Sequence, residues 1–181
     1  MQGKSSYPSM EWTAERVSRF WDYEAQFPER YFTYAQGSAM VSRLEHYFQG
    51  SRKILDYACG PGHLSARLID RGYSVGAVEF SEKALQSVRS RFENESSFLG
   101  AYRPEEARDL GTRFDTIFAC EVLEHLDDAT LSLAVSDLRS LVASDGRVIV
   151  TTPNAERLEE SNLLCPNCEQ VFHRWQHVRS W

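Results

Sequence analysis

Long hydrophobic runs are missing from this 181-residue chain. No segment approaches the ~18 consecutive apolar residues that a membrane-spanning helix needs. The first six residues, MQGKSS, also lack the apolar core of a secretory signal. We therefore expect no membrane segment and a cytoplasmic protein.

The chain also has few cysteines and no excess of positive charge. Only four cysteines are present, and Cys59 and Cys120 stand alone in apparent core or turn segments. A disulfide framework is therefore not expected, and the thiols should be reduced. The formal net charge of −6 gives no broad attraction to phosphate backbones, which disfavours nucleic acid as a partner but still allows a local basic patch.

Strand-like and helix-like segments alternate after residue 50. The expected strands are residues 52–57, 74–80, 97–99, 114–120 and 147–152. The expected helices between them are residues 63–70, 81–92 and 129–142. This alternation predicts an α/β fold with a Rossmann-like, doubly wound, mainly parallel sheet of about five strands.

The first fifty residues differ, because aromatic side chains recur there at helix-like spacing. These are Trp12, Phe20, Trp21, Tyr23, Phe27, Tyr31, Phe32 and Tyr34. Helices are expected at residues 11–25, 28–35 and 38–48. Two interpretations stay open: the aromatics pack a helical cap against the sheet, or they form a lid over a bound ligand.

A glycine-bearing turn follows the first expected strand, in the stretch ILDYACGPGH of residues 54–63. Such a turn, opening into a helix, presents unpaired backbone N–H groups to a ligand, and glycine allows that ligand to approach closely. The second strand ends at Glu79, 17 residues beyond Gly62, where a carboxylate can accept both hydroxyls of a ribose. A dinucleotide fingerprint would need a third glycine at Ser65. The pattern therefore predicts a nucleotide-type site of another kind.

Residues 56–62 resemble motif I of the class I S-adenosylmethionine-dependent methyltransferases, and Glu79-Phe80-Ser81 resembles the next motif of that family. The resemblance implies S-adenosylmethionine as the cofactor. The residues assigned to it are Asp56, Ala58, Gly60, Gly62, Glu79, Phe80, Tyr102 and Cys120. The sequence departs from the family at Ala58, which replaces the first glycine of the motif. It also departs at Ala101, where the family often has an acidic residue that accepts a hydrogen bond from the adenine amino group. Adenine recognition would then depend on backbone groups near Tyr102.

Residues 114–126, FDTIFACEVLEHL, resemble the fourth motif in the form seen in ubiquinone-pathway O-methyltransferases and their small-molecule relatives. Residues 146–154 resemble the fifth strand and the loop after it, so the likeness covers about residues 50–155. It implies an enzyme that transfers a methyl group to a small-molecule acceptor, with a hydroxyl oxygen as the expected acceptor atom.

Glu121, Glu124 and His125 are the candidate catalytic residues, because they directly follow the fourth strand. We favour His125 as a general base acting without a tightly held metal. Alternatively, the three side chains bind Mg²⁺, Mn²⁺ or Zn²⁺. Glu-x-x-Glu-His resembles the metal motif of small-RNA 3′-terminal 2′-O-methyltransferases, which add a later histidine that His173 or His177 could supply. A cofactor-binding module without turnover is the remaining alternative.

A second candidate metal site lies near the end of the sequence, where Cys165 and Cys168 form a Cys-x₂-Cys pair and His173 and His177 follow. This pattern predicts a compact zinc knuckle, with solvent-exposed cysteines on a loop as the alternative. The two histidines cannot fully serve both candidate metal sites.

Three regions are expected: an N-terminal helical cap or lid (1–50), an S-adenosylmethionine-binding core (51–155) and a Cys/His segment (156–181). Class I methyltransferases usually continue after the fifth strand with a helix and a two-stranded hairpin, whereas 29 residues follow Thr152 here. We therefore expect a shortened form or a fragment of a longer protein. The uncovered sheet edge would then allow a homodimer.

Overall fold

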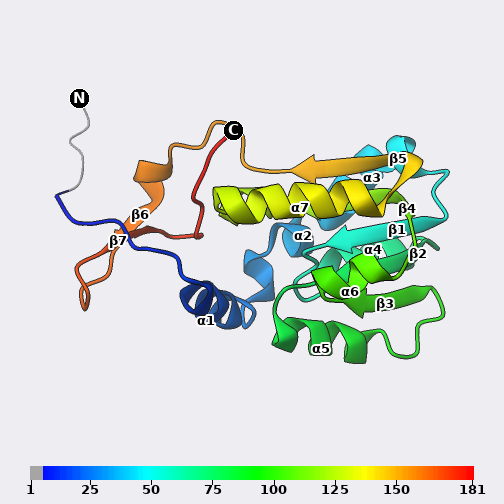
Figure 1. Ribbon diagram of the computed structural model, residues 1–181, viewed down its shortest axis with the longest axis horizontal. Helices are drawn as coiled ribbons and strands as arrows, with labels where there is room; N and C mark the ends of the chain where they lie inside the picture. The colour runs from blue at the N-terminus through cyan, green and yellow to red at the C-terminus, as the bar shows by residue number, and fades with distance from the viewer. Residues whose placement is uncertain (1–5) are drawn as a thin grey trace.

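A five-stranded parallel sheet in the order β3-β2-β1-β4-β5 forms the centre of the computed structural model, which describes residues 6–181 (Figure 1). The strands are β1 (Lys53–Tyr57), β2 (Ser74–Val78), β3 (Phe98–Tyr102), β4 (Phe114–Cys120) and β5 (Val142–Thr151). Because β1 pairs in parallel with both β2 and β4, the strand order reverses beside β1. In open sheets of this type, ligands bind at that reversal, outside the carboxyl ends of the strands. The predicted fold class is confirmed.

Helices cover both faces of the sheet. One face carries α3 (Gly37–Phe48), α4 (His63–Ile69) and α5 (Glu82–Arg91), and the other carries α6 (Pro104–Asp109) and α7 (Asp128–Leu141). Ile54 and Val75 pack on the first face, while Leu55 and Val78 pack on the second. The strands are therefore apolar at consecutive positions, as expected where both faces are buried.

The structure corrects several predicted boundaries. The helix α7 passes directly into β5, since Val142 is already extended (φ −76°, ψ 141°); the strand therefore starts five residues before its predicted beginning. The predicted helix over residues 28–35 divides into the 3₁₀ helix η1 (Pro28–Arg30) and α2 (Phe32–Ala35), because Tyr31 between them is extended. The short helix α6 was not predicted.

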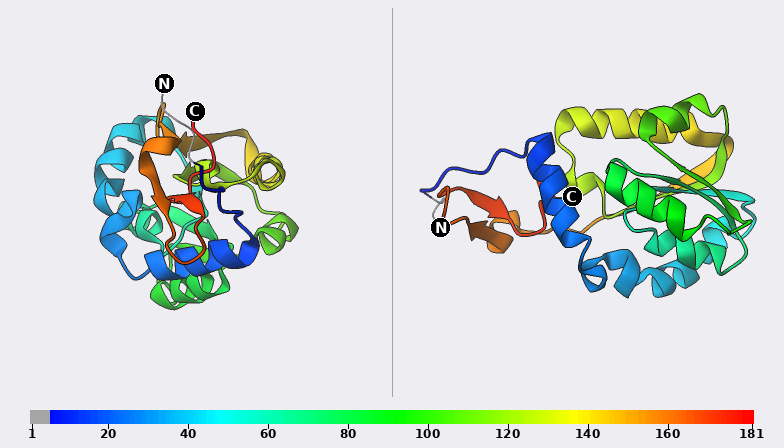
Figure 2. Two further views of the ribbon diagram at one scale, coloured as in Figure 1. Left: turned by 90° about the vertical axis from the view of Figure 1, so that its left-hand side faces the viewer. Right: turned by 90° about the horizontal axis from the view of Figure 1, so that it is seen from below.

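The N-terminal and C-terminal segments of the described chain lie together beyond the carboxyl ends of the strands (Figures 1 and 2). There lie helix α1 (Ala14–Glu24), the 3₁₀ helix η3 (Leu158–Ser161) and an antiparallel hairpin of β6 (Asn162–Leu164) and β7 (Val171–His173). Residues 8–10 join the hairpin, because Met10 N donates to Val171 O and Val171 N donates to Pro8 O, both at 2.8 Å. The sequence analysis missed this hairpin.

Within residues 6–181, no helix has both the length and the apolar character needed to cross a bilayer. Among these residues β5 forms one edge of the large sheet and pairs with β4 alone. The division into three regions and the homodimer stay predictions.

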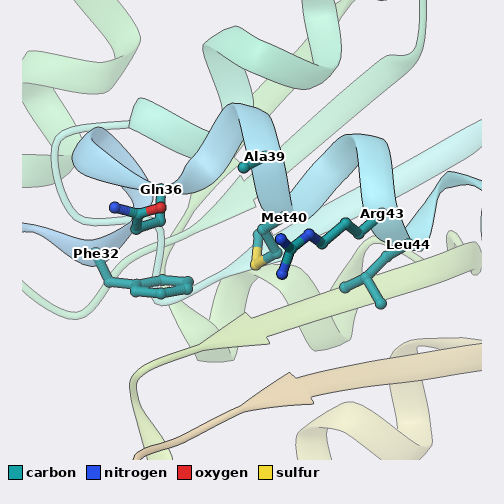
Figure 3. A pocket seen from close by; sticks show the side chains of 6 residues that line it. All are labelled: Phe32, Gln36, Ala39, Met40, Arg43 and Leu44. Carbon is teal, nitrogen blue, oxygen red and sulfur yellow. The ribbon is translucent and has the colours of Figure 1, made fainter.

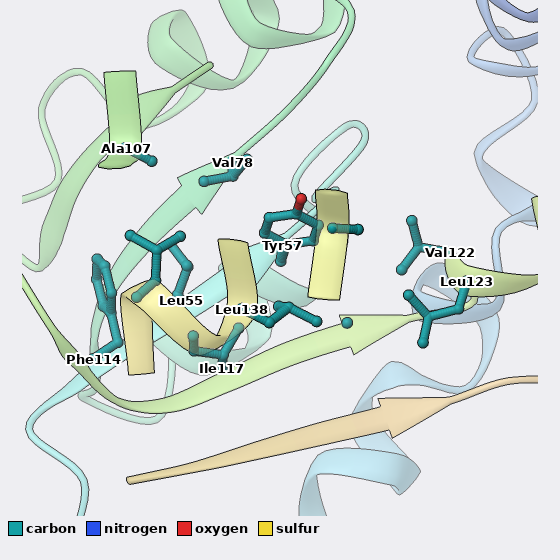
Figure 4. Packing of buried hydrophobic residues seen from close by; sticks show 12 residues of the cluster. Leu55, Tyr57, Val78, Ala107, Phe114, Ile117, Val122, Leu123 and Leu138 are labelled. Atoms are coloured by element: carbon teal, nitrogen blue, oxygen red, sulfur yellow. The ribbon is translucent and has the colours of Figure 1, made fainter. Parts of the chain in front are cut away.

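A buried polar contact connects the sheet to the helices α6 and α7 beneath the ligand edge. Tyr57 lies in the largest apolar cluster (Figure 4), and its hydroxyl donates to Asp137 Oδ2 at 3.0 Å. Arg108 Nε donates to the other carboxylate oxygen at 2.5 Å. Tyr57 is fully buried, so its hydroxyl depends on Asp137 for a hydrogen bond.

Replacing Asp137 with Ala should lower the free energy of unfolding by about 2–3 kcal/mol, because the Tyr57 hydroxyl becomes a buried group without a partner. Urea unfolding measures this loss. The matched change Arg108→Ala should cost under about 1 kcal/mol, since the arginine is half-exposed. Equal losses in the two variants would contradict the assigned role of the buried hydroxyl.

Candidate functional site

The glycine turn lies at the carboxyl end of β1 and has the unusual backbone that its sequence predicted. Ala58, Gly60 and Gly62 have φ values of 60°, 52° and 74°, all in the left-handed region. A Cβ atom at Gly60 would lie 3.3 Å from the Tyr31 ring, and one at Gly62 would lie 2.9 Å from the Phe92 ring. Both glycines are therefore required by backbone conformation and by close neighbours.

Glu79 connects the two predicted motifs. Its Oε2 accepts from Gly60 N at 2.8 Å, and its Oε1 accepts from Phe80 N at 2.7 Å and Ser81 N at 2.8 Å. Burial raises the pKa of Glu79, and these three hydrogen bonds oppose that shift. The carboxylate is thus held at the turn, at the end of β2, where a ribose was expected.

Asp56 lies beneath the same turn and explains why serine occupies the position of a third glycine. Its Oδ2 accepts from Ser65 N at 3.0 Å and from Ser65 Oγ at 2.7 Å. Burial raises the pKa of Asp56 to about 6, although both hydrogen bonds oppose the shift. The Ser65 side chain therefore ties α4 to β1.

The other predicted cofactor residues follow the ends of neighbouring strands. Phe80 is partly exposed, and its ring meets the edge of Tyr57 at 5.7 Å. The carbonyl of Tyr102, at the end of β3, accepts from Glu79 N at 3.0 Å. Cys120 ends β4, with its Sγ 3.9 Å from Met40 Sδ; burial raises the pKa of this thiol. All predicted cofactor residues thus lie along the edge formed by β1 to β4.

The predicted catalytic residues begin where β4 ends. Glu121 has a φ of 52°, and its N–H donates to Thr151 O at 2.9 Å. The 3₁₀ helix η2 (Leu123–His125) then buries Glu124, which is 1% exposed. Neither carboxylate oxygen of Glu124 has a hydrogen-bond partner among the described residues. Burial raises the pKa of Glu124 to about 7, and the charge of Glu121 adds to the shift.

His125 lies in contact with a histidine from the C-terminal segment. Its ring centroid is 4.8 Å from that of His177, and its Nε2 is 4.0 Å from Glu124 Oε1. Burial, together with the neighbouring His177, lowers the pKa of His125 to about 3. Glu124, His125 and His177 each offer one potential metal-ligating atom, all within 4.8 Å of one another. This cluster, called here the acceptor-side triad, is the later-histidine arrangement that one of the sequence alternatives required.

The predicted zinc knuckle is not assembled from its four residues. Cys165 and Cys168 lie at the turn between β6 and β7, where Glu169 N donates to Cys165 O at 2.9 Å. The extended strand β7 then carries the chain away at about 3.3 Å per residue. His173 and His177 consequently join Glu156, and among residues 6–181 no potential metal-binding group includes a cysteine.

Two histidines four residues apart would lie on one face of a helix, but His173 and His177 come together in another way. No helix follows β7 in the described chain; a turn stacks the rings of His173 and His177 at 4.5 Å between centroids, with 17° between planes. Their proximity therefore comes from the turn.

Several side chains at the site were missed by sequence analysis. Trp21 of α1 meets the His125 ring at 4.8 Å, edge to face, and its Nε1 donates to Gln176 Oε1 at 3.1 Å. Gln176 is 1% exposed, and its Nε2 donates to His125 O at 2.9 Å. The ring centroid of Trp21 also lies 6.2 Å from that of Tyr31, whose ring packs closely against Gly60. The aromatic spacing of the first fifty residues was the available signal, but it could not identify these partners.

A groove of about 300 Å³ lies on α2 and α3 (Figure 3). It is lined by Phe32, Gln36, Ala39, Met40, Arg43 and Leu44. Its Met40 contacts the predicted site residue Cys120, and none of these lining residues belongs to the acceptor-side triad.

Comparison with known proteins agrees with this geometry. The methyltransferase domain family matches residues 23–181. A ubiquinone biosynthesis O-methyltransferase of Bordetella avium (strain 197N) is 29% identical over 142 residues, 76% of this chain and 57% of that protein. The chain thus spans somewhat over half the length of this curated relative.

Solved structures share the fold. The glycopeptide N-methyltransferase MtfA complexed with S-adenosyl-L-methionine superposes with a TM-score of 0.58 at 21% identity, over 76% of this chain and 65% of that one. The methyltransferase domain of bacterial CtHen1-CN gives a TM-score of 0.54 at 25% identity, over 68% of each chain. The chain belongs to the methyltransferase domain family, as its motifs indicated.

Ala58 provides a test of the strained turn. Its left-handed backbone costs roughly 1–2 kcal/mol for a residue with a Cβ, and glycine recovers this at about 0.5–1 kcal/mol of extra unfolded-state entropy. Ala58→Gly should therefore raise the free energy of unfolding by about 0.5–1 kcal/mol in urea titrations. Ala77→Gly, in the buried middle of β2, should instead destabilise the chain. A loss in both variants would contradict the strain at Ala58.

Proposed function

We propose that the chain binds S-adenosylmethionine at the carboxyl edge of β1, β2 and β3 and transfers its methyl group to a hydroxyl oxygen of a small molecule. The observation that carries this proposal is the juxtaposition of two kinds of group at one edge. The glycine turn and Glu79 follow β1 and β2, while the acceptor-side triad begins at the end of the neighbouring β4. The name of the Bordetella relative, ubiquinone biosynthesis O-methyltransferase, supports oxygen as the acceptor atom.

The cofactor half of the site uses groups that are already placed. Glu79 exchanges backbone partners for the ribose hydroxyls, and the N–H groups around Gly60 and Gly62 face the rest of the nucleoside. Asp56 supplies a buried carboxylate for the amino-acid end of the cofactor, since burial raises its pKa and a bound ammonium group would stabilise its charged form. Backbone groups of Tyr102 lie where adenine recognition is expected.

The acceptor half must align an oxygen with the sulfonium methyl and keep water away. Trp21 and Gln176 close the site over His125, and their mutual hydrogen bond fixes this cover. His125 presents a neutral imidazole because of its burial. When no cation is bound, its free ring nitrogen is the group placed to accept the proton that leaves the acceptor hydroxyl, although the burial that keeps the ring neutral also makes it a weak base.

The sequence favoured His125 as a base without a metal, but the groups of the acceptor-side triad also support a bound divalent cation. Both oxygens of buried Glu124 lack hydrogen-bond partners among the described residues, which costs free energy unless another group satisfies them. One carboxylate and two imidazoles suit Mn²⁺ or Zn²⁺. When bound, such a cation would lower the pKa of the acceptor hydroxyl. Glu124, His125 and His177 would hold it.

Methylation of the 3′-terminal 2′-hydroxyl of RNA is the second candidate function. It is favoured by one observation: the structure places a later histidine, His177, beside Glu124 and His125. The net charge of −6 argues against broad attraction to RNA. Methyl transfer to single-stranded RNA, compared with the same strand ending in a 2′-deoxynucleotide and with a panel of hydroxylated small molecules, separates the two candidates.

Glu79→Ala should weaken binding of S-adenosylhomocysteine at least tenfold, because it removes charge-assisted hydrogen bonds worth about 1.5–3 kcal/mol each before compensation. Isothermal calorimetry measures the change. Glu79→Gln should bind with intermediate affinity, and Glu93→Ala, exposed after α5, with unchanged affinity. Equal affinity in the wild type and Glu79→Ala would contradict the assignment of Glu79 to the ribose. Micromolar binding of NAD without any binding of S-adenosylmethionine would contradict the proposed methyltransferase function.

Glu124→Gln should abolish bound cation and reduce methyl transfer by about 10²-fold or more, because the acceptor hydroxyl loses its activation. Elemental analysis and a radiolabelled methyl-transfer assay test both effects. EDTA should inhibit the wild type, Mn²⁺ should restore it, and exposed Glu160→Gln should behave as wild type. Full methyl transfer after EDTA treatment would mean that the reaction needs no cation and that His125 acts alone as the base.

A further inference from the structure

Glu156 lies between two stacked imidazoles that reach the site from the C-terminal segment. Its Oε2 is 2.5 Å from His177 Nδ1, and its Oε1 is 3.2 Å from His173 Nε2. The carboxylate is mostly buried, and His173 is 4% exposed. This pairing belongs neither to the cofactor turn nor to the predicted zinc knuckle.

The protons of His173 can be assigned from its partners. Its Nδ1 faces two backbone donors, Trp175 N and His177 N, each at 3.2 Å. An imidazole nitrogen that accepts hydrogen bonds carries no proton, so the proton of the neutral ring lies on Nε2. That nitrogen lies 3.2 Å from Glu156 Oε1, within ion-pair distance but without the geometry of a hydrogen bond.

The same reasoning applies to His177. An ionised carboxylate only accepts hydrogen bonds, so the contact with Glu156 Oε2 places the proton of neutral His177 on Nδ1. Its Nε2 then keeps a lone pair. His125 is similar: its Nδ1 lies 3.5 Å from the Gln176 carbonyl, and its Nε2 lies on the side of Glu124. In water, by contrast, a neutral histidine is free to exchange between the two tautomers.

We propose that Glu156 is a positioning residue that fixes His177 as its Nδ1–H tautomer and thereby presents His177 Nε2 to the acceptor-side triad. This inference deepens the proposed function and rests on the same site. Glu156 does not touch the acceptor or the cofactor. It acts through His177, as carboxylates commonly do when they hydrogen-bond a metal-binding imidazole.

His173 has a supporting part in this arrangement. Its Nε2 lies 3.2 Å from the second oxygen of Glu156, and its Nδ1 accepts a hydrogen bond from the backbone N–H of His177. The Nδ1 contact fixes the turn that carries His177 and so holds the His177 ring beside the Glu156 carboxylate. This accounts for two histidines four residues apart, of which only His177 belongs to the triad.

The tautomer of His177 tests the inference without any cation. Long-range ¹H–¹⁵N correlation spectra of the metal-free protein at pH 8 report which nitrogen carries the proton, and loss of one ring in His177→Gln assigns the signals. The wild type and exposed Glu159→Ala should show Nδ1–H at His177. Glu156→Ala should shift His177 toward Nε2–H, and Glu156→Gln, which keeps one acceptor oxygen, should shift it less. An Nε2–H ring in the wild type, or no shift in both Glu156 variants, would overturn the inference.

Binding of Mn²⁺, followed by electron paramagnetic resonance, then separates this inference from the proposed function. Glu156→Ala should bind Mn²⁺ about 10–100-fold more weakly than the wild type, as for other partners of metal-binding histidines, while Glu159→Ala binds it equally well. Unchanged Mn²⁺ affinity in Glu156→Ala overturns the positioning role. A second outcome also overturns it: Glu124→Gln binds Mn²⁺ fully while Glu156→Ala binds none, which would make Glu156 itself a ligand of the cation. If the wild type binds no Mn²⁺, the cation in the proposed function fails, and the tautomer measurement alone decides the role of Glu156.

Discussion

The parallel pairing of β1 with both β2 and β4 is the constraint on which the site depends. It directs the carboxyl ends of three strands to one edge, so that Asp56, Glu79 and Glu124 are buried near one another. Each buried carboxylate needs donors. Ser65 provides them for Asp56 and three backbone N–H groups provide them for Glu79, whereas Glu124 has none among the described residues. The one unsatisfied acid of the three is thus the one for which we propose a role in acceptor chemistry.

Both ends of the described chain complete that edge. Trp21 comes from α1 and Gln176 from the segment after β7, yet the two side chains bond to each other and to His125. Their contact excludes water from an imidazole that burial keeps neutral. The cover of the site and the chemical state of His125 therefore have the same physical origin.

The sequence predicted the fold, and it predicted site residues that the structure brings to one edge of the sheet. The alternation of strand-like and helix-like segments predicted the parallel sheet. The glycines at 60 and 62 predicted a turn that a ligand can approach closely, and the structure gives that turn a left-handed backbone. Short elements without a strong pattern, such as α6 and the β6–β7 hairpin, were missed because only tertiary packing stabilises them. Ala58 shows the limit of local rules, since a glycine position is occupied by a residue that the surrounding structure holds in a strained conformation.

The sequence by itself determined the parallel α/β architecture and the glycine turn that ends β1, because these follow from residue types at fixed local spacing. Only the tertiary structure decided which distant groups meet. Cys165, Cys168, His173 and His177 lie close together in sequence, but an extended strand separates the cysteines from the histidines. Glu156, 31 residues after His125, instead takes part in the site through His177. The spacing of residues within one strand or turn determines the directions of their side chains. Contacts between distant segments depend instead on how the whole chain packs.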